Sequence, residues 1–342
     1  AANPSIAADG SVVAVAFSAS DPLDRTDIYV AMSTDGGHTF GSPVRVNDVA
    51  GDASVNGEQP PRVEISNNAI VVVWTSKGKV GTRMLHARSD DGGKTFSHAA
   101  PIAGTDAAGN RGWESIAGPF ALWLDHREYS HHDANPDHSK LYFGAIDGST
   151  PPRALTGGVC YCCKTALATS GAHVYAAWRH VYPGNMRDIA FTASSDGGKT
   201  FSPPIRVSQD KWMINGCPEN GPALAVDASH HVHVVWPTLV KGAEDNLALF
   251  YAQTKDATTF TPRVQIPTHG TPRHVQIAAS DHSLVVAWDE TADGRRQIVA
   301  SHVPKFDRLV LGDGVYPAVA SSGKTIVAAW KAQDAIQITI VE

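Results

Sequence analysis

Short runs of apolar and β-branched residues, each ending in an aromatic residue, recur along the whole chain. The seven runs span residues 12–17, 70–74, 120–123, 174–178, 232–236, 284–288 and 326–330. They are too short for amphipathic helices, and β-branched and aromatic residues favour strands. The pattern therefore predicts an all-β chain built from repeated units.

Each run is part of a larger unit. A short strand precedes it, as at residues 62–65 or 165–168, and the first six runs are followed by a third strand and mostly by a fourth. Radial repetition of four-stranded units is typical of a β-propeller. We predict one propeller domain over residues 1–342 with seven four-stranded antiparallel blades, the last three-stranded or completed by N-terminal residues. Six blades are the alternative.

A second repeat marks turns. Residues 33–40, 89–96 and 194–201 share the pattern Ser-x-Asp-Gly-Gly-x-Thr-Phe, and residues 254–260 carry a degraded copy. An Asp-Gly-Gly turn between two alternating runs predicts a hairpin with glycine at positive φ. The pattern resembles the Asp-box, or bacterial neuraminidase repeat, of sialidase propellers. That resemblance implies a folding role for the turns, and it is the source of the six-bladed alternative, since sialidases have six blades.

The blade order sorts the unusual residues by face. If strands A to D run outward from the channel, the Asp-Gly-Gly turns join strands C and D on a far face. The B–C loops and the connections into each strand A then lie on the opposite, near face. We expect the near face to collect all four cysteines and the two histidines that follow the strand-B aromatics of blades 3 and 4: Cys160, Cys162, Cys163, Cys217, His126 and His180.

Composition and charge limit the classes of partner that this chain is expected to bind. The 342-residue chain has a net charge of −6, without a basic block or an apolar run of membrane-spanning length. Nucleic acid and a membrane span are therefore not expected. The chain starts at Ala-Ala-Asn-Pro without methionine, which fits a secreted or periplasmic protein after removal of a signal peptide.

Three cysteines within four positions predict a soft-metal site. Thiolate and imidazole ligands suit copper and zinc. Adjacent Cys162 and Cys163 bind neighbouring ions more readily than one tetrahedral ion, which favours a multinuclear copper(I) cluster over zinc. We expect Cys160, Cys217 and the two histidines to complete it. The Cys-x-Cys-Cys spacing is similar to that of small periplasmic copper-resistance proteins, which hold copper clusters but are not propellers.

A copper site of this kind has two functional interpretations. It could be the cofactor of an oxidoreductase, with Lys164, Glu114 and Arg179 orienting a polar or anionic substrate. It could instead store copper or exchange it with a donor or acceptor protein. The competing hypothesis is structural disulfides between these cysteines, in a non-catalytic binding propeller.

The resemblance to sialidases implies a glycoside hydrolase as the alternative function. It implies a tyrosine nucleophile with a glutamate partner, for which Tyr316 and Glu219 are the candidates. Carboxylate-binding arginines are implied too, and Arg127 and His274 are further substrate-binding candidates on the near face. The arginines proposed for the carboxylate are Arg62, Arg179 and Arg273. The Phe/Tyr-Arg-Ile-Pro signature is absent, and Pro61-Arg62-Val63 stands nearest to it.

Overall fold

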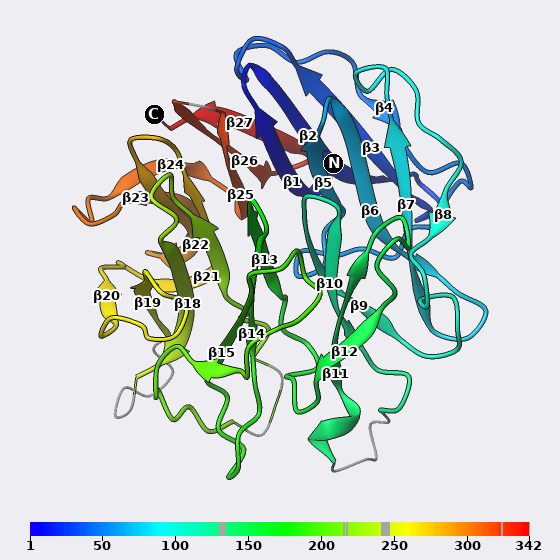
Figure 1. Ribbon diagram of the computed structural model, residues 1–342. Coiled ribbons are helices and arrows are strands. Elements are labelled where there is room, and N and C mark those ends of the chain that lie inside the picture. The colour runs from blue at the N-terminus through cyan, green and yellow to red at the C-terminus, as the bar shows by residue number, and fades with distance from the viewer. Residues whose placement is uncertain (130–134, 215, 217, 241–246, 323, 342) are drawn as a thin grey trace.

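Seven antiparallel sheets surround a central channel in the computed structural model (Figure 1). The structure describes residues 1–342 except 130–134, 215, 217, 241–246, 323 and 342. Six sheets have four strands and the seventh has three, and every sheet keeps its strands in chain order. The prediction of a seven-bladed all-β propeller is confirmed, and the six-bladed alternative is wrong.

The first three blades contain twelve strands. Blade 1 has β1 (Ala2–Asp9), β2 (Val12–Ser20), β3 (Thr26–Ser33) and β4 (Val44–Arg45). Blade 2 has β5 (Arg62–Ser66), β6 (Ala69–Lys77), β7 (Thr82–Ser89) and β8 (Ala100–Pro101). Blade 3 has β9 (Arg111–Ala117), β10 (Phe120–Asp125), β11 (Lys140–Ala145) and β12 (Arg153–Thr156), with the short 3-10 helix η1 (Pro136–His138) before β11.

The remaining blades follow the same order. Blade 4 has β13 (Ala166–Ser170), β14 (His173–Arg179), β15 (Ile189–Ser194) and β16 (Ile205–Arg206). Blade 5 has β17 (Ala223–Val226), β18 (Val232–Leu239), β19 (Leu247–Thr254) and β20 (Val264–Ile266). Blade 6 has β21 (Thr271–Ala279), β22 (Leu284–Ala292), β23 (Arg295–His302) and β24 (Leu309–Asp313), and blade 7 has β25 (Val315–Ser322), β26 (Thr325–Ala332) and β27 (Ala335–Ile340).

The aromatic residues of the sequence repeat form the core between blades. The tryptophans that end the second-strand runs of blades 2 to 6 are at most 1% exposed: Trp74, Trp123, Trp178, Trp236 and Trp288. Each packs with apolar residues of its own and the preceding blade. Burying one large aromatic per blade accounts for the regular spacing of these residues in the sequence.

In four blades, the inner strand carries a β-bulge opposite the aromatic residue that ends the second-strand run. Two residues of β1, β9, β21 and β25 oppose one residue of the neighbouring strand, which is Phe17, Trp123, Trp288 or Trp330. The first bulged residue has a positive φ in every case: Asn3, Trp113, His274 and Tyr316. Bulges re-aim side chains beside functional sites, and these four lie at the near-face start of the inner strands.

The three Asp-Gly-Gly turns, here called the aspartate turns, join the third and fourth strands of blades 1, 2 and 4. In the first, Ser33 Oγ donates to Asp35 Oδ1 at 2.7 Å and accepts from Gly37 N, while Thr39 N and Oγ1 both donate to Asp35. The turns at Asp91 and Asp196 repeat this arrangement. They lie on the far face, as predicted.

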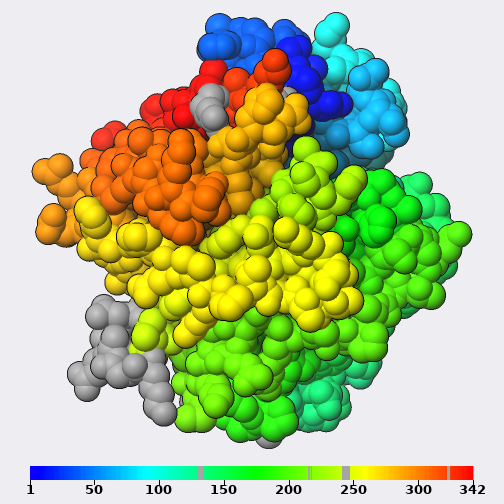
Figure 2. All heavy atoms as spheres, turned by 60° about the vertical axis from the view of Figure 1, so that its left-hand side comes forward, coloured from blue at the N-terminus to red at the C-terminus, as the bar shows by residue number. Residues whose placement is uncertain are grey.

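The two ends of the chain close the ring. The blue N-terminal and red C-terminal segments lie side by side in Figures 1 and 2, and the Ala1 amino group donates to Asp334 O at 3.0 Å. Blade 7 stays three-stranded, because β1 pairs within blade 1. Within the described residues, no helix is long and apolar enough to cross a membrane.

Candidate functional site

A cluster of charged and aromatic side chains gathers on the near face around the bulge residue His274. Its Nε2 lies 2.8 Å from Glu58 Oε1, and its Nδ1 contacts Asp289, which also binds Arg296. The Tyr316 ring lies 4.4 Å from the imidazole, centroid to centroid. We call Glu58, His274, Asp289, Arg296 and Tyr316 the His274 cluster.

The local backbone positions this cluster. His274 and Tyr316 are both bulge residues, so neighbouring blades 6 and 7 present their side chains at the same level. The Tyr316 ring passes so close to Gly57 that a Cβ there would overlap it. Asn56 Oδ1 accepts hydrogen bonds from the backbone of Glu58 and Gln59, which fixes the loop that carries Glu58.

A second group, Arg62, Glu114 and Lys164, lies beside the first. Arg62 and Lys164 line a cavity of about 200 Å³ that is bounded by inner-strand residues of all seven blades. Arg62 Nε donates to Glu114 O at 2.8 Å, and Lys164 Nζ donates to Val275 O. Glu114 has no exposed surface, and its carboxylate is 3.3 Å from Thr75 Oγ1.

Burial and charge shift the pKa values of these groups. Burial raises the pKa of Glu114 to about 7, although the Arg62 charge opposes the shift. Burial, followed by the charge of Arg62, lowers the pKa of Lys164 to about 7, against the pull of Glu58 and Asp289. Burial lowers the pKa of His274, but its hydrogen bonds to the Asp289 and Glu58 carboxylates outweigh this and raise the net pKa. Perturbed groups beside a cavity are typical of functional sites.

Tyr316 titrates above its ordinary range. Burial is the largest cause of its raised pKa, and the negative charges of Glu58, Asp289 and Glu219 add to it, while Arg296 opposes them. Glu219 itself is exposed, and its charge is the smallest of these contributions to the raised pKa of Tyr316. The raised pKa keeps the phenol protonated at neutral pH, and the His274 imidazole is the titratable ring that packs against it.

Three predicted arginines lie outside this arrangement. Arg179 is buried, and its guanidinium donates to the carbonyls of Asn220, Arg187 and Pro237, so it ties blade 4 to blade 5. Arg127 pairs with buried Asp125 and lies over the Tyr142 ring. Arg273 is exposed at the start of β21. Of the proposed carboxylate-binding arginines, only Arg62 lines the channel cavity.

Sequence reasoning missed Glu58, Asp289 and Arg296. Asp289 directly follows the strand-B tryptophan of blade 6, the position at which Arg179 was noticed in blade 4. An acidic residue at that position could have marked Asp289 as a candidate site residue. Glu58 lies in the connection before blade 2, and no motif marks it, so only the fold brings it to His274.

The cysteines form a separate cluster at the entry to blade 4. The Sγ atoms of Cys160, Cys162 and Cys163 all lie within 4.8 Å of one another, and all three residues are buried. Cys160 and Cys163 are free thiols, whereas Cys162 is disulfide-bonded. Cys217 lies outside the described residues. A sulfur held in a disulfide is not a thiolate ligand, so this state of the cluster offers two thiols to a metal.

Charge polarises the two free thiols. Cys163 Sγ donates to Cys160 Sγ at 3.4 Å, and Arg187 Nη1 donates to the same acceptor at 3.0 Å. The pKa of Cys160 is lowered to about 6. The hydrogen bond from Cys163 is the main cause, and the charges of Arg187 and Arg179 contribute further. Burial raises the pKa of Cys163 well above its ordinary value. The hydrogen bond from Cys163 and the Arg187 guanidinium both favour the thiolate form at Cys160.

The predicted histidine ligands lie near the cysteines but outside the sulfur group. Among the described residues, the candidate metal group contains neither His126 nor His180. His126 is buried and packs against Trp113 and Tyr129. His180 Nδ1 accepts from Trp178 Nε1 at 3.3 Å, and burial lowers its pKa to about 4.

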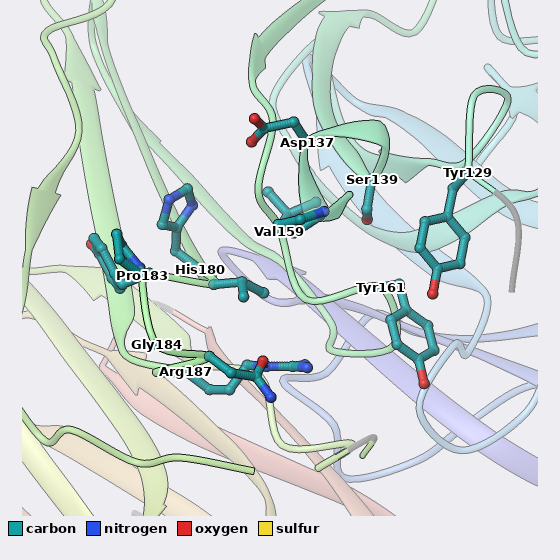
Figure 3. Close-up of a pocket in the computed structure, with 13 residues that line it drawn as sticks. Tyr129, Asp137, Ser139, Val159, Tyr161, His180, Pro183, Gly184 and Arg187 are labelled. Atoms are coloured by element: carbon teal, nitrogen blue, oxygen red, sulfur yellow. The ribbon is translucent and has the colours of Figure 1, made fainter. Parts of the chain in front are cut away.

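A cavity of about 680 Å³ opens next to the cysteines. Figure 3 shows Tyr129 and Tyr161 on one side of it and His180 and Arg187 on the other. The two tyrosine rings stack at 5.4 Å. Val159 and Tyr161, the neighbours of Cys160 in sequence, line this cavity together with Arg187. We call it the Arg187 cavity.

No protein-family model matches the sequence, and no curated protein matches it. The fold, however, is similar to solved carbohydrate-active enzymes. A polysaccharide lyase of the PL25 ulvan lyase family, bound to a sulfated glucuronyl-rhamnose unit, superposes with a TM-score of 0.57 at 12% identity, covering 99% of this chain and 92% of that chain. An α-L-arabinanase from Penicillium chrysogenum gives 0.56 at 10% identity, covering 100% and 93%.

A sialidase is also similar in fold. The Hadza microbial sialidase Hz136 superposes with a TM-score of 0.52 at 15% identity, covering 99% of this chain and 65% of that chain. At these identities the likeness shows the fold. The chain therefore shares its propeller architecture with lyases and glycosidases.

Proposed function

We propose that this protein is a carbohydrate-active enzyme that cleaves a glycosidic bond next to a carboxylate-bearing sugar. The observation that carries the proposal is the His274 cluster, where a phenol, an imidazole and carboxylates meet beside Arg62 and Lys164. Ligand sites in propellers lie at the channel, with polar groups converging from several blades. Fold neighbours that act on glycans support the same assignment.

The roles follow from charge and position. Arg62 is a cationic group at the channel cavity, and its guanidinium suits a sugar carboxylate, while Lys164, with a pKa of about 7, adds a second basic group there. Tyr316 supplies the reacting phenol. Its proton passes to a neighbouring carboxylate, with Glu219 and Glu58 as the candidates whose charges act on it. His274, held cationic between Glu58 and Asp289, donates a proton to the leaving oxygen.

In the hydrolytic version, the Tyr316 oxygen bonds to the anomeric carbon as the glycosidic C–O bond breaks. Water then releases the sugar and returns the proton to the phenolate. In the lyase version, the phenolate removes the proton α to the sugar carboxylate, and the glycosidic oxygen leaves with the proton from His274. Both versions use the same residues, and the products distinguish them.

Activity assays on two substrate types test the proposal. A fluorogenic sialoside reports hydrolysis, and a uronate-containing polysaccharide reports elimination through the ultraviolet absorbance of its unsaturated product. Tyr316→Phe should lower kcat/KM on the active substrate about 10³-fold, within the range expected for loss of an acid–base group or nucleophile.

Tyr142→Phe is the matched control, since Tyr142 lies in blade 3 against Trp123, away from the cluster. It should retain activity. Absence of turnover on both substrate types, or unchanged turnover in Tyr316→Phe, would refute the assignment.

Copper binding stays a prediction. The observation in its favour is the set of three buried sulfur atoms within 4.8 Å, and the disulfide at Cys162 must be reduced before all three can act as ligands. A periplasmic or secreted location also stays a prediction, and a disulfide fits such an oxidising compartment. Metal analysis of reduced protein after exposure to copper(I) or zinc tests the site.

A further inference from the structure

The free thiols of Cys160 and Cys163 sit at the two ends of one tight turn. Cys163 N donates to Cys160 O at 3.5 Å, and the two sulfur atoms are 3.4 Å apart. Residues i and i+3 of a turn are near enough for a disulfide with ordinary Cα separation. The local backbone therefore permits a bond between these sulfurs with little movement.

Arg187 completes the arrangement. Its Nη1 donates to Cys160 Sγ at 3.0 Å, and its Nε donates to Asn185 Oδ1 at 3.1 Å, so the guanidinium is held on the sulfur. A fixed cation beside a buried sulfur stabilises the thiolate, which is the nucleophilic form. Cys163 Sγ, in contrast, donates its hydrogen to Cys160 Sγ at 3.4 Å, so Cys160 accepts from both the second thiol and the guanidinium.

The Arg187 cavity lies directly beside this pair. Both cysteines are nearly inaccessible to solvent: the exposed fraction is 1% for Cys160 and 2% for Cys163. The cavity wall, however, is made by Val159 and Tyr161 on either side of Cys160 and by Arg187 itself (Figure 3). Its volume of about 680 Å³ is large enough to admit a small oxidant.

We propose that Cys160 and Cys163 are a redox-active dithiol that a small hydroperoxide oxidises to a disulfide. The Cys160 thiolate attacks one peroxide oxygen, the O–O bond breaks, and the alkoxide or hydroxide takes a proton from solvent. Cys160 is then a sulfenic acid. The Cys163 sulfur attacks the Cys160 sulfur, the S–O bond breaks, and water leaves with the Cys163 proton. The two thiols supply both electrons.

Oxidation would also change the cavity. A disulfide removes the thiolate that neutralises Arg187, which leaves the guanidinium facing the cavity with Asn185 as its side-chain acceptor. The oxidised protein should therefore hold anions in the Arg187 cavity more tightly than the reduced protein. This site is separate from the His274 cluster, and the inference does not depend on the proposed glycan cleavage.

Thiol mapping after graded hydrogen peroxide tests the proposal. Chelator-washed protein is reduced mildly, treated with peroxide, alkylated and digested. One equivalent of peroxide should remove both thiols together and yield a peptide linked through Cys160 and Cys163. In Cys163→Ser, a sulfenic acid should accumulate on Cys160 and be trapped by dimedone. In Cys160→Ser, Cys163 should stay unoxidised.

Arg187 variants separate the chemistry from folding. Arg187→Leu should slow Cys160 oxidation about 10-fold, because the thiolate loses its cation, and Arg187→Lys should recover most of the rate. Thermal unfolding of each variant shows that the fold persists. Thiols that resist peroxide in the folded protein, that oxidise independently of each other, or that become linked through Cys162 would overturn the proposal.

Discussion

Glu114 is a carboxyl group with no exposed surface, placed beside Arg62 near the channel. From the sequence, Glu114 is a residue expected to orient a polar or anionic substrate. The bulge at Trp113 and Glu114 explains its position, because two residues of β9 there oppose the single residue Trp123. Its raised pKa makes Glu114 a neutral hydrogen-bonding group at mildly acidic pH.

A pH dependence of stability follows. The folded pKa of about 7 lies above the ordinary value of 4.5, so between these pH values the folded chain keeps a proton that the unfolded chain has released. Stability contributed by this proton is complete below pH 4.5 and is lost as pH rises through 7. Glu114→Gln lacks this titration. The stability of the wild type should therefore fall relative to Glu114→Gln by on the order of 3 kcal/mol across the interval.

Denaturant unfolding of both proteins at several pH values measures the difference. Glu128→Gln, which removes an exposed carboxylate paired with Lys140, is the control and should leave the pH slope unchanged. Parallel slopes for wild type and Glu114→Gln would mean that burial does not raise this pKa.

At the scale of single elements, the aspartate turns show how a short motif holds two strands. Asp91 accepts hydrogen bonds from Ser89 Oγ, Lys94 N, Thr95 N and Thr95 Oγ1. The preceding residue, Asp90, instead forms an exposed ion pair with Arg88. The motif is therefore specific to one of two adjacent acidic residues.

Asp91→Ala should destabilise the protein by about 1–2 kcal/mol, because backbone and hydroxyl donors of the turn lose their acceptor. Asp90→Ala should cost less than about 0.5 kcal/mol, as exposed ion pairs contribute little. Chemical denaturation compares the two variants. Equal losses would show that the carboxylate network does not stabilise the turn.

At the scale of the whole molecule, the same turns join neighbouring blades. A Cβ at Gly198 of blade 4 would lie 2.7 Å from Phe143 in blade 3, and one at Gly93 of blade 2 would lie 2.6 Å from Met32 in blade 1. A Cβ at Gly37 of blade 1 would meet Val327 of blade 7 at 3.2 Å, so this contact spans the junction that closes the ring. The second glycine of each turn is thus a packing surface between blades.

Adjacent glycines allow this contact to be measured. Gly197 and Gly198 have φ values of 73° and 78°, so alanine is strained at both, by about 1 kcal/mol. Only at Gly198 does the new Cβ also meet Phe143. Gly198→Ala should therefore be less stable than Gly197→Ala by about 1–3 kcal/mol. Thermal or denaturant unfolding of both variants gives the difference, and similar losses would contradict a packing role between blades.

The sequence by itself determined the features that depend on local pattern. Strand runs ending in Trp74 or Trp288 and turns built on Asp35 or Asp91 are encoded within a few residues, so seven units and their far-face turns could be predicted. Strand alternation also placed Cys160, Cys162 and Cys163 on the near face, in the connection into blade 4, where they lie.

Only the tertiary structure decided which side chains meet. His274 and Tyr316 come together with Glu58 because bulges re-aim two inner strands and ring closure brings blade 7 next to the loop before blade 2. The sequence placed Arg179 and Tyr316 alike, as polar residues of the near face. In the structure, the Arg179 guanidinium donates its hydrogen bonds to backbone carbonyls, whereas Tyr316 belongs to the His274 cluster. Which side chains converge on a site, and which of them are used up in hydrogen bonds to the backbone, depends on contacts between segments distant in sequence. No local sequence pattern contains that information.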